Sequence, residues 1–357
     1  MNELADLVRL SRFAGERFDL VQAGGGNASI KTADGFMTIK ASGVSMSDMN
    51  LHHGHTTLNV AALHQIFAEA PSLQAMSRAV RDRVVCERIA HAGKPGTPRP
   101  SIETLLHAVL GKFVLHTHPL AVNMIACRKD WQTVFRSIFP ESILVEYHTP
   151  GLDLALALCA RLRETPEASR SETTLIFLQQ HGMIVSSEDS EGVLQTTEAV
   201  TDRLERWLAV DLSAYRIVSD VSRYVNRLAD EPRVSYLSQD EELRRLLDER
   251  PELFDTRPFC PDMAVYNGPA IHRTDKLSDV DGLMAYVRRY GELPRVIVHK
   301  SEIFLVATSL RKAREMESVL KFHLLVLKHS PPPINSLDDS EIAYLGNWEA
   351  EQYRRKL

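Results

Sequence analysis

The sequence predicts a protein of two α/β domains, a larger one over residues 1–212 and a smaller one over residues 213–357. Its 357 residues are about twice the length of a typical domain of roughly 150 residues. Short apolar runs alternate with helical patterns through the first 210 residues, which is typical of sheets covered by helices. A charged segment without glycine, 213–255, then precedes further strand and helix patterns, so we expect a helical connector and a small accessory domain.

The first half of the larger domain begins with a helix and a hairpin. Apolar residues recur at helical spacing within residues 1–18, which predicts an amphipathic helix. The runs 28–31 and 37–40 flank an Asp-Gly dipeptide, a strong signal for a tight turn between two strands. Helices are expected at 58–68 and 76–91, and the loop 93–100 follows because it is rich in glycine and proline.

The second half of the larger domain starts with a helix that opens at Ser101, a plausible N-cap. The patterns then predict, in order, a strand at 112–118, a helix at 119–128, a strand at 143–147, a helix at 152–163, strands at 175–181 and 183–186, and a helix at 189–210.

In the smaller domain the patterns predict strands at 264–266, 295–299 and 303–306, a helix at 309–328, a loop at 331–333, and a last helix ending in Trp348. Residues 175–200 and 295–320 share the order strand, turn, strand, helix. This similarity fits either a degenerate repeat or the common occurrence of that order.

Composition excludes several classes of protein. The chain is 44% hydrophobic and 25% charged, which argues against a disordered or fibrous chain. A net charge of −5 argues against nucleic-acid binding through a broad basic surface. No apolar run reaches the roughly 18 residues of a membrane-spanning helix, and the first residues lack the apolar stretch of a secretion signal. Four distant cysteines without CxxC spacing fit a reducing compartment, so we expect a cytoplasmic protein.

Three histidines are candidate metal ligands. His116 and His118 lie two apart on a predicted strand and therefore share one face of it. His181 precedes Gly182, which permits a tight turn at the end of another strand. Three neutral imidazoles with an open position are the composition of a catalytic zinc site. The alternative is three unrelated histidines packed near strand ends.

Other polar residues lie at positions with chemical meaning. Glu103 opens a helix, where its carboxylate can act beside a metal or simply favour the helix dipole. Residues 24–27 are glycine-rich, and their N–H groups with Asn27 can form an anion nest. Ser42, Gly43 and Ser101 are small donors of the kind that hold a phosphate, although each is also an ordinary turn residue.

An ordered set of motifs resembles the class II aldolase/adducin family over roughly residues 4–210. The set is GGGNAS at 24–29, ASG at 41–43, PSIETLLH at 100–107, HTHPLA at 116–121, PG at 150–151 and QQHG at 179–182. The resemblance implies a three-layer domain with a central, mostly antiparallel sheet between helices. It also implies a homo-oligomer, since tetramers are common in the family.

The resemblance assigns roles to individual residues. It implies a divalent metal ion, zinc first, on His116, His118 and His181, with Glu103 as the acid/base. It implies that the substrate phosphate binds at Gly26, Asn27, Ser42, Gly43 and Ser101. Aldolases of the family cleave a ketose 1-phosphate to dihydroxyacetone phosphate and an aldehyde. The metal would stabilise the developing enediolate, and phosphate binding would hold the reacting carbons beside it.

Differences between members of the family indicate which of its reactions to expect. Glutamate at 103 favours cleavage or dehydration, because related 4-epimerases carry aspartate there. Dehydratases, decarboxylases and epimerases of the family remain alternatives, as does a non-catalytic scaffold, which adducin-like members exemplify without the histidines. Fuculose-phosphate-type aldolases place a proton-donating tyrosine about twenty residues after the histidine pair. Residues 119–146 contain no tyrosine, so the proton donor is unassigned.

The C-terminal segments PFCPDMAVYNGP and LPRVIVHKSEIFLVATS are similar to those that follow the aldolase part of bifunctional rhamnulose-1-phosphate aldolase/dehydrogenase proteins. No dinucleotide-binding fingerprint is found, so we expect no nicotinamide cofactor. Residues 213–357 are expected to serve as an accessory or assembly domain, or to cover the active site.

Overall fold

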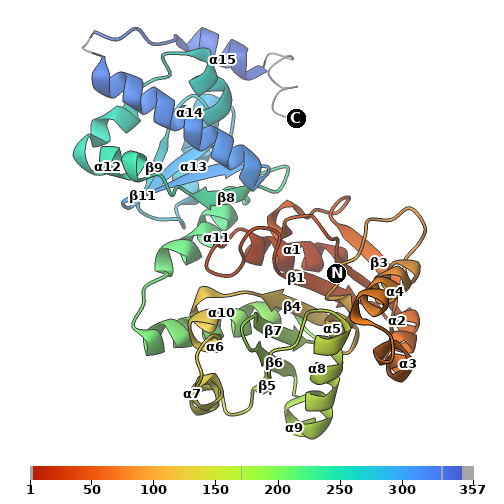
Figure 1. Ribbon diagram of the computed structural model, residues 1–357. Helices are drawn as coiled ribbons and strands as arrows, with labels where there is room; N and C mark the ends of the chain where they lie inside the picture. Colours follow the sequence, from red (N-terminus) through yellow and green to blue (C-terminus); the bar gives the residue numbers. More distant parts are fainter. Residues whose placement is uncertain (1–2, 170, 331–332, 348–357) are drawn as a thin grey trace. The chain divides into compact units, whose positions relative to one another are not determined.

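The computed structural model describes residues 3–169, 171–330 and 333–347, which form two compact units that divide between Leu212 and Ser213 (Figure 1). Within these ranges, one unit contains a seven-stranded sheet and the other a four-stranded sheet. None of the helices in the described ranges combines the length and the apolar character needed to span a bilayer.

The sheet of the first unit has the order β3-β2-β1-β4-β7-β6-β5, and every neighbouring pair is antiparallel except β5 and β6. This confirms the expected mostly antiparallel sheet. The strands are β1 (Asn27–Lys31), β2 (Phe36–Lys40), β3 (His55–Asn59), β4 (Phe113–Thr117), β5 (Ile143–Val145), β6 (Thr173–Leu178) and β7 (Gly182–Ser187).

Helices cover both faces of this sheet. They are α1 (Glu3–Gly15), α2 (Val60–Ala68), α3 (Ala70–Gln74), α4 (Arg78–His91), α5 (Thr104–Ala108), α6 (Leu120–Ala126), α7 (Trp131–Ile138), α8 (Leu152–Glu164), α9 (Pro166–Ser169) and α10 (Ser190–Leu208), with a short 3-10 helix, η1 (Met46–Asp48). One apolar core lies between the sheet and α1, α6, α7 and α10, and a second between the sheet and α2, α4, α5 and α8. Figure 1 shows α10 and α8 on opposite sides of the strands.

Alternation along β4 produces these two cores. Leu115 belongs to the first core and its neighbour Val114 to the second, because successive side chains of a strand point to opposite faces. Each such leucine or valine, buried from water, contributes roughly 1.5–3 kcal/mol of transfer free energy. The two faces together fix the register of β4, which carries His116.

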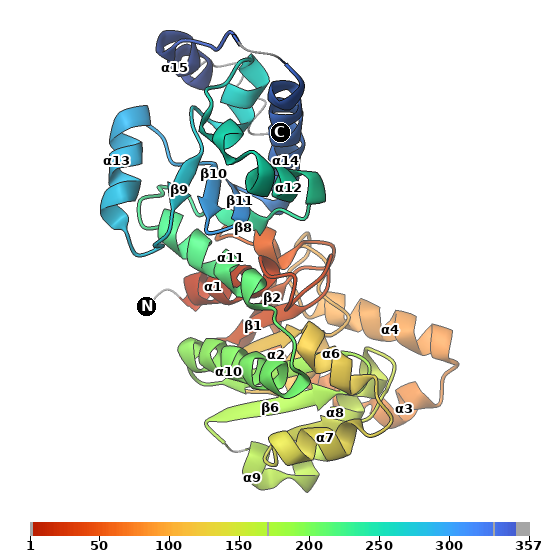
Figure 2. The same cartoon turned by 90° about the vertical axis from the view of Figure 1, so that its left-hand side faces the viewer.

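The second unit is a smaller sheet with the order β8-β11-β10-β9. Its elements are α11 (Ser213–Val225), β8 (Val234–Leu237), α12 (Glu241–Glu249), η2 (Pro251–Asp255), η3 (Met263–Asn267), β9 (His272–Thr274), α13 (Val280–Tyr290), β10 (Val296–His299), β11 (Glu302–Ala307), α14 (Leu310–His329) and α15 (Asp339–Asn347). Side chains of α11 and α13 pack on one face of the sheet and those of α12 and α14 on the other. Figure 2 shows α13 and α14 on opposite sides of these strands.

Several expectations from local patterns are wrong. The run 264–266 is not a strand but part of the helical turn η3, which Pro261 precedes and Gly268 follows at φ 84°. Three apolar residues are too few to separate the two periodicities. Strands β3, β8 and β9 were not predicted, and α11 and β8 are built into the second unit rather than linking it. Residues 331–332 and Trp348 lie outside the described residues.

The similarity between residues 175–200 and 295–320 extends to all four strands of the second unit's sheet. Strands β8, β11, β10 and β9 repeat the order and directions of β4, β7, β6 and β5, including one parallel pair with an intervening helix. The tight turns contain Gln180 and Lys300, both at φ 55°. Phe304 pairs with Leu237 as Ile184 pairs with His116, so Leu237 takes the position of His116 in the second unit.

Gly182 allows β4 and β7 to approach closely, because a Cβ there would lie 2.2 Å from the carbonyl oxygen of Thr117. We expect Gly182→Ala to lower the free energy of unfolding by about 1–3 kcal/mol, the usual cost of overpacking. Gly24→Ala is the matched control, since nothing lies within 4 Å of a Cβ at Gly24. Urea unfolding measures both variants, and equal stabilities would contradict this role of Gly182.

Burial lowers the pKa of His323 on α14 to about 4. In the unfolded chain a histidine titrates near 6.5, so between about pH 6.5 and 4 the unfolded state binds the proton first and stability falls as pH falls. Over that window His323→Gln should flatten the dependence of unfolding free energy on pH by up to about 1.4 kcal/mol per pH unit. Chemical unfolding at a series of pH values tests this, and an unchanged slope would rule it out.

Candidate metal centre

Four of the predicted site residues converge on one point. One ligand atom from each of Glu103, His116, His118 and His181 lies within 4.8 Å of all the others. Glu103 caps α5, His116 belongs to β4, His118 follows β4, and His181 lies in the turn before β7. These segments meet because β4 and β7 are neighbours in the sheet. The expectation that His181 ends a strand needs a small correction, since β6 stops at Leu178.

The spacing of the imidazole nitrogens fits a single ion. The Nε2 atom of His116 is 3.1 Å from Nε2 of His118 and 3.3 Å from Nε2 of His181. Nitrogens bound at about 2.0–2.1 Å to a tetrahedral ion are about 3.4 Å apart. The donor set and its spacing therefore suit a divalent metal ion.

Backbone contacts fix the orientation of His116. Its Nδ1 lies 2.9 Å from the carbonyl oxygen of Met183, which only accepts, so Nδ1 carries the proton. When the ring is neutral, the lone pair of Nε2 faces the cluster, as in metal sites where the second ring nitrogen donates to a carbonyl. Burial, together with the positive charge that His116 and His181 can carry, lowers the pKa of His118 to about 3. The imidazole of His118 is therefore neutral and available as a ligand at neutral pH.

Glu103 is a buried carboxylate with two distinct oxygens. Oε1 lies 3.0 Å from Nε2 of His181 and 3.5 Å from Nε2 of His116. Oε2 accepts a hydrogen bond of 2.6 Å from the side-chain amide of Asn27. Burial opposes ionisation, but His116 and His181 hold the pKa of Glu103 well below its usual range. The side chain is thus a charged carboxylate with one oxygen facing the histidines.

The predicted phosphate residues lie on three neighbouring loops. The Ser42 N–H donates to the carbonyl of Arg99 at 2.8 Å, which places exposed Ser42 and Gly43 beside the segment that contains Ser101. Gly26 is buried at φ 70° under His116, where a Cβ would lie 3.0 Å from the His116 carbonyl oxygen. The amide of Asn27 is directed to Glu103, so its role in this arrangement is to orient the carboxylate.

Lys40 was not identified from the sequence, yet it joins two of these loops. It is only 2% exposed, and its Nζ donates to the Val44 carbonyl at 2.8 Å and lies 3.5 Å from that of Gly24. Burial lowers the pKa of Lys40, and the Glu103 carboxylate partly opposes this effect. Its cationic group therefore lies beneath the glycine-rich loop and the ASG loop. The available signal was a lysine at a strand end, directly before Ala-Ser-Gly.

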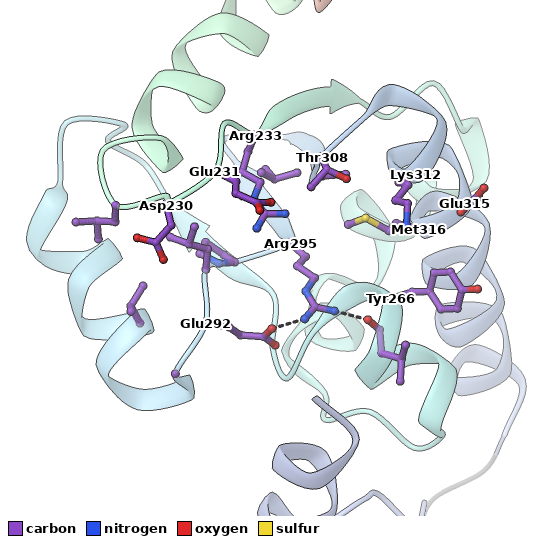
Figure 3. Close-up of a pocket in the computed structure, with 18 residues that line it drawn as sticks. Asp230, Glu231, Arg233, Tyr266, Glu292, Arg295, Thr308, Lys312, Glu315 and Met316 are labelled. Carbon is purple, nitrogen blue, oxygen red and sulfur yellow. Dashed lines mark hydrogen bonds and ion pairs between the residues drawn. The ribbon is translucent and has the colours of Figure 1, made fainter. Parts of the chain in front are cut away.

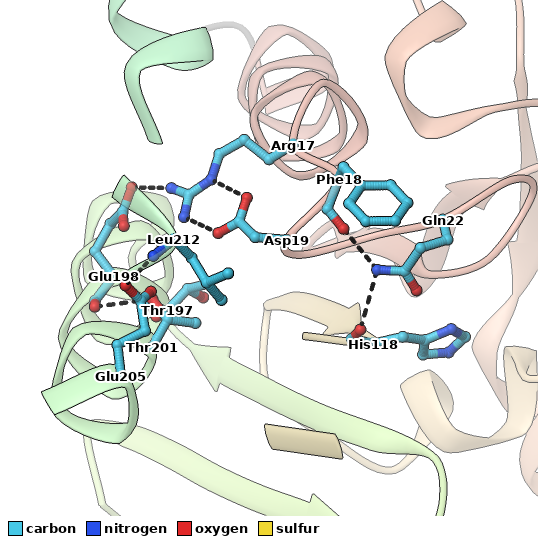
Figure 4. Close-up of polar contacts among 10 residues, drawn as sticks. All are labelled: Arg17, Phe18, Asp19, Gln22, His118, Thr197, Glu198, Thr201, Glu205 and Leu212. Carbon is cyan, nitrogen blue, oxygen red and sulfur yellow. Dashed lines mark hydrogen bonds and ion pairs between the residues drawn. The ribbon is translucent and has the colours of Figure 1, made fainter. Parts of the chain in front are cut away.

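His118 lies beyond the end of β4, where the sheet no longer fixes it, and residues 18–22 hold it instead (Figure 4). Its N–H donates to the Leu20 carbonyl at 2.9 Å, and the amide of Gln22 approaches its carbonyl oxygen at 3.4 Å. The N–H of Leu120, two residues on, donates to the Asp19 carbonyl at 2.8 Å. The backbone on both sides of His118 is thereby attached to one segment.

A buried ion pair anchors that segment. Arg17 is fully buried and donates through Nε to Oδ1 of Asp19 at 3.0 Å and through Nη2 to Oδ2. Its Nη1 pairs with Glu198 of α10 (Figure 4). Residues 17–19 are therefore tied to helix α10, and His118 is tied to them. Sequence reasoning missed this pair because Arg-x-Asp is no recognised signature.

The sequence profile of a family described as "Class II Aldolase and Adducin N-terminal domain" matches residues 5–208. A Bacillus subtilis protein named as an uncharacterized oxidoreductase, YuxG, is 27% identical over 214 residues. The match covers 57% of this chain and 29% of that protein, so the chain spans less than a third of that relative's length.

Two solved structures are among those to which part of the chain is similar. The N-terminal class II aldolase domain of a conserved protein from Thermoplasma acidophilum is 24% identical, with a TM-score of 0.48. That likeness covers 58% of this chain and 94% of that one. The L-fuculose-1-phosphate aldolase of Thermus thermophilus is 16% identical with a TM-score of 0.36, covering 57% of this chain and 89% of that one.

The ion pair of Arg17 and Asp19 makes a testable prediction about metal binding. Because Asp19→Asn leaves Arg17 buried with one charged partner fewer, we expect residues 18–22 to loosen and His118 to lose its fixed position. Zinc affinity should fall about 10- to 100-fold, the usual effect of losing a group that orients a ligand. Competition with a chromophoric chelator measures this affinity.

Asp202→Asn is the matched control, because Asp202 forms an exposed ion pair with Arg206 on the same helix α10. Its zinc affinity should equal that of the unaltered protein. If Asp19→Asn also retains full zinc affinity while folded, as judged by circular dichroism, the ion pair does not position His118.

Proposed function

Because the chain belongs to the class II aldolase and adducin family, we propose that it is a divalent-metal-dependent lyase that cleaves a ketose 1-phosphate to dihydroxyacetone phosphate and an aldehyde. The observation that carries the proposal is the convergence of Glu103 with His116, His118 and His181. Zinc is the proposed ion, since three neutral imidazoles suit it, although other divalent ions accept the same ligands.

A divalent ion held by the three histidines would supply Lewis-acid polarisation of the substrate carbonyl. In this proposal Glu103 moves the proton. Oε2 is held by Asn27, whereas Oε1 faces the histidines, so Oε1 is the oxygen that would transfer the proton. A carboxylate that is ionised at neutral pH accepts the hydroxyl proton whose removal starts carbon–carbon cleavage, and it can return a proton to the carbon released.

The three neighbouring loops support a phosphate site in the proposal. Gly26, Ser42, Gly43 and Ser101 would provide backbone and hydroxyl donors, and the Lys40 ammonium group beneath two of the loops adds positive charge. Binding the phosphate there would hold the reacting carbons near the histidines. The entropy cost of orienting the substrate is then met on binding and not in the reaction step. Asn27 contributes in this scheme by orienting Glu103.

The proposal further places the protein in the cytoplasm as a homo-oligomer that acts on a phosphorylated sugar, without nucleic-acid or membrane partners. No residue is assigned the place of the family's tyrosine, because residues 119–146 contain no tyrosine. Dehydration, decarboxylation and epimerisation use the same type of cluster and are the alternatives within the family. The non-enzymatic alternative is a scaffold protein that binds partners without catalysing a reaction.

Glu103→Gln and His116→Ala separate these possibilities. We expect the unaltered protein to contain one divalent ion per chain and to release dihydroxyacetone phosphate from a ketose 1-phosphate. Glu103→Gln should keep the ion while kcat falls about 10²–10⁴-fold, because the proton-transfer group is lost. His116→Ala should lose both the ion and turnover. Elemental analysis and a coupled assay for dihydroxyacetone phosphate measure these effects.

His91→Ala, at an exposed histidine on α4, is the control and should alter neither quantity. The substrate panel contains ketose 1-phosphates, ketose 5-phosphates and unphosphorylated sugars. Full turnover without a metal would overturn the proposal. A folded, metal-loaded protein that turns over none of the panel would favour the scaffold.

A further inference from the structure

The second unit contains a cavity of about 610 Å³, within the usual size range of small-molecule sites (Figure 3). It is lined by the segment before β8, the loop between α13 and β10, the end of β11 and the first turns of α14. All of its lining residues belong to the second unit. It is therefore independent of the Glu103 cluster and of the function proposed above.

The repeated sheet arrangement gives a physical reason for this cavity. At the corresponding end of the first unit, Ser186 accepts a hydrogen bond of 2.9 Å from the Gly111 N–H, and Ser187 donates to the Glu172 carbonyl at 3.0 Å. The matched register places Val306 and Ala307 at the positions of these serines. Neither side chain has a hydroxyl group that could form a hydrogen bond to the neighbouring backbone. This end of the second sheet is therefore not closed by such bonds, and the cavity lies there.

Arg233 provides the positive charge of the cavity. Among the residues that the structure describes, no carboxylate lies within ion-pair distance of its guanidinium. Arg295, by contrast, donates to the Val265 carbonyl and pairs with Glu292 (Figure 3). Burial and the positive charge of Arg295 lower the pKa of Arg233, while Glu231 opposes them. A partly desolvated cation without a close counter-ion is costly, and an anionic ligand group would relieve that cost.

The remaining lining limits the kind of anion. Four carboxylate side chains face three cationic ones, so a multiply charged phosphate would meet net repulsion. These residues are Asp230, Glu231, Glu292 and Glu315 against Arg233, Arg295 and Lys312. Glu292 is paired with Arg295, and Glu315 lies 3.8 Å from Nε of Arg311. Ionised carboxylates only accept hydrogen bonds, so Asp230 and Glu231 suit hydroxyl or amino donors on a ligand. Val306 and Met316 add an apolar surface for a short carbon chain.

We propose that this cavity binds a small organic acid with a single carboxylate and a body that carries hydroxyl or amino groups. The carboxylate lies on the Arg233 guanidinium, whose planar donors match two carboxylate oxygens. The donors of the ligand body bond to Asp230 or Glu231, and its carbon chain contacts Val306. The second unit is thereby a ligand-binding domain that uses the sheet arrangement of the first unit without its metal ligands.

Isothermal titration of the full chain tests the proposal with three probes: D-gluconate for hydroxy acids, L-serine for amino acids, and inorganic phosphate. We expect saturable binding of gluconate or serine, and the stronger of the two identifies the donor type. Phosphate should bind at least about tenfold more weakly because of the acidic lining. Arg233→Gln should weaken binding of the better acid about 10- to 100-fold, the loss expected for a charged hydrogen-bond pair.

Arg288→Gln, at an exposed arginine on α13, is the matched control and should bind as the unaltered chain does. Thr308→Trp keeps Arg233 and fills the cavity from an exposed position on its lining, so it should also abolish binding. Thermal unfolding checks that each variant is folded. The proposal is overturned if neither acid binds up to about 20 mM, on the order of the weakest useful affinities. It is likewise overturned if phosphate binds as well as the acids, or if folded Arg233→Gln or Thr308→Trp keeps full affinity.

Discussion

The pairing of β4 with β7 is the constraint on which the candidate metal centre depends. His116 lies opposite Ile184 in this antiparallel ladder, and the turn that enters β7 carries His181. A shift of one residue in register would move His116 to the other face of the sheet. Apolar cores on both faces oppose such a shift, because Val114 and Leu115 would exchange environments. Packing energy in the sheet therefore sets the geometry of the polar cluster.

Buried charges in the first unit are better explained by positioning than by stability. Replacing a buried ion pair with well-packed apolar residues is often neutral or stabilising. Arg17 nevertheless lies fully buried beside Asp19, and Lys40 lies buried among backbone carbonyls. The first pair ties down the segment that holds His118, and the lysine joins two loops beside Glu103. Both connect loop segments to strands or helices.

The two units share a sheet arrangement but carry different side chains at matched positions. The order and directions of four strands agree between them, as do the left-handed turn residues Gln180 and Lys300. The side chains at matched positions do not agree, since Leu237 stands where His116 stands in the first unit. The first unit gathers its polar groups at the β6–β7 turn and closes the other end of the sheet with serine hydroxyls. The second unit leaves that other end open and lines it with charged groups.

The sequence alone determined the family of the first unit, most of its helices and strands, and the four residues that meet in the cluster. It could do so because glycine turns, the spacing of His116 and His118, and the order of the motifs are local features. Strand β3, the helical turn at Met263–Asn267, Lys40 and the Arg17–Asp19 pair were decided only by the tertiary structure. Their roles depend on contacts with residues far away or with backbone carbonyls, and no short pattern encodes such contacts. The cavity at the end of the second sheet is also a feature that only the tertiary structure decides, because it is recognised by comparing the registers of two distant segments.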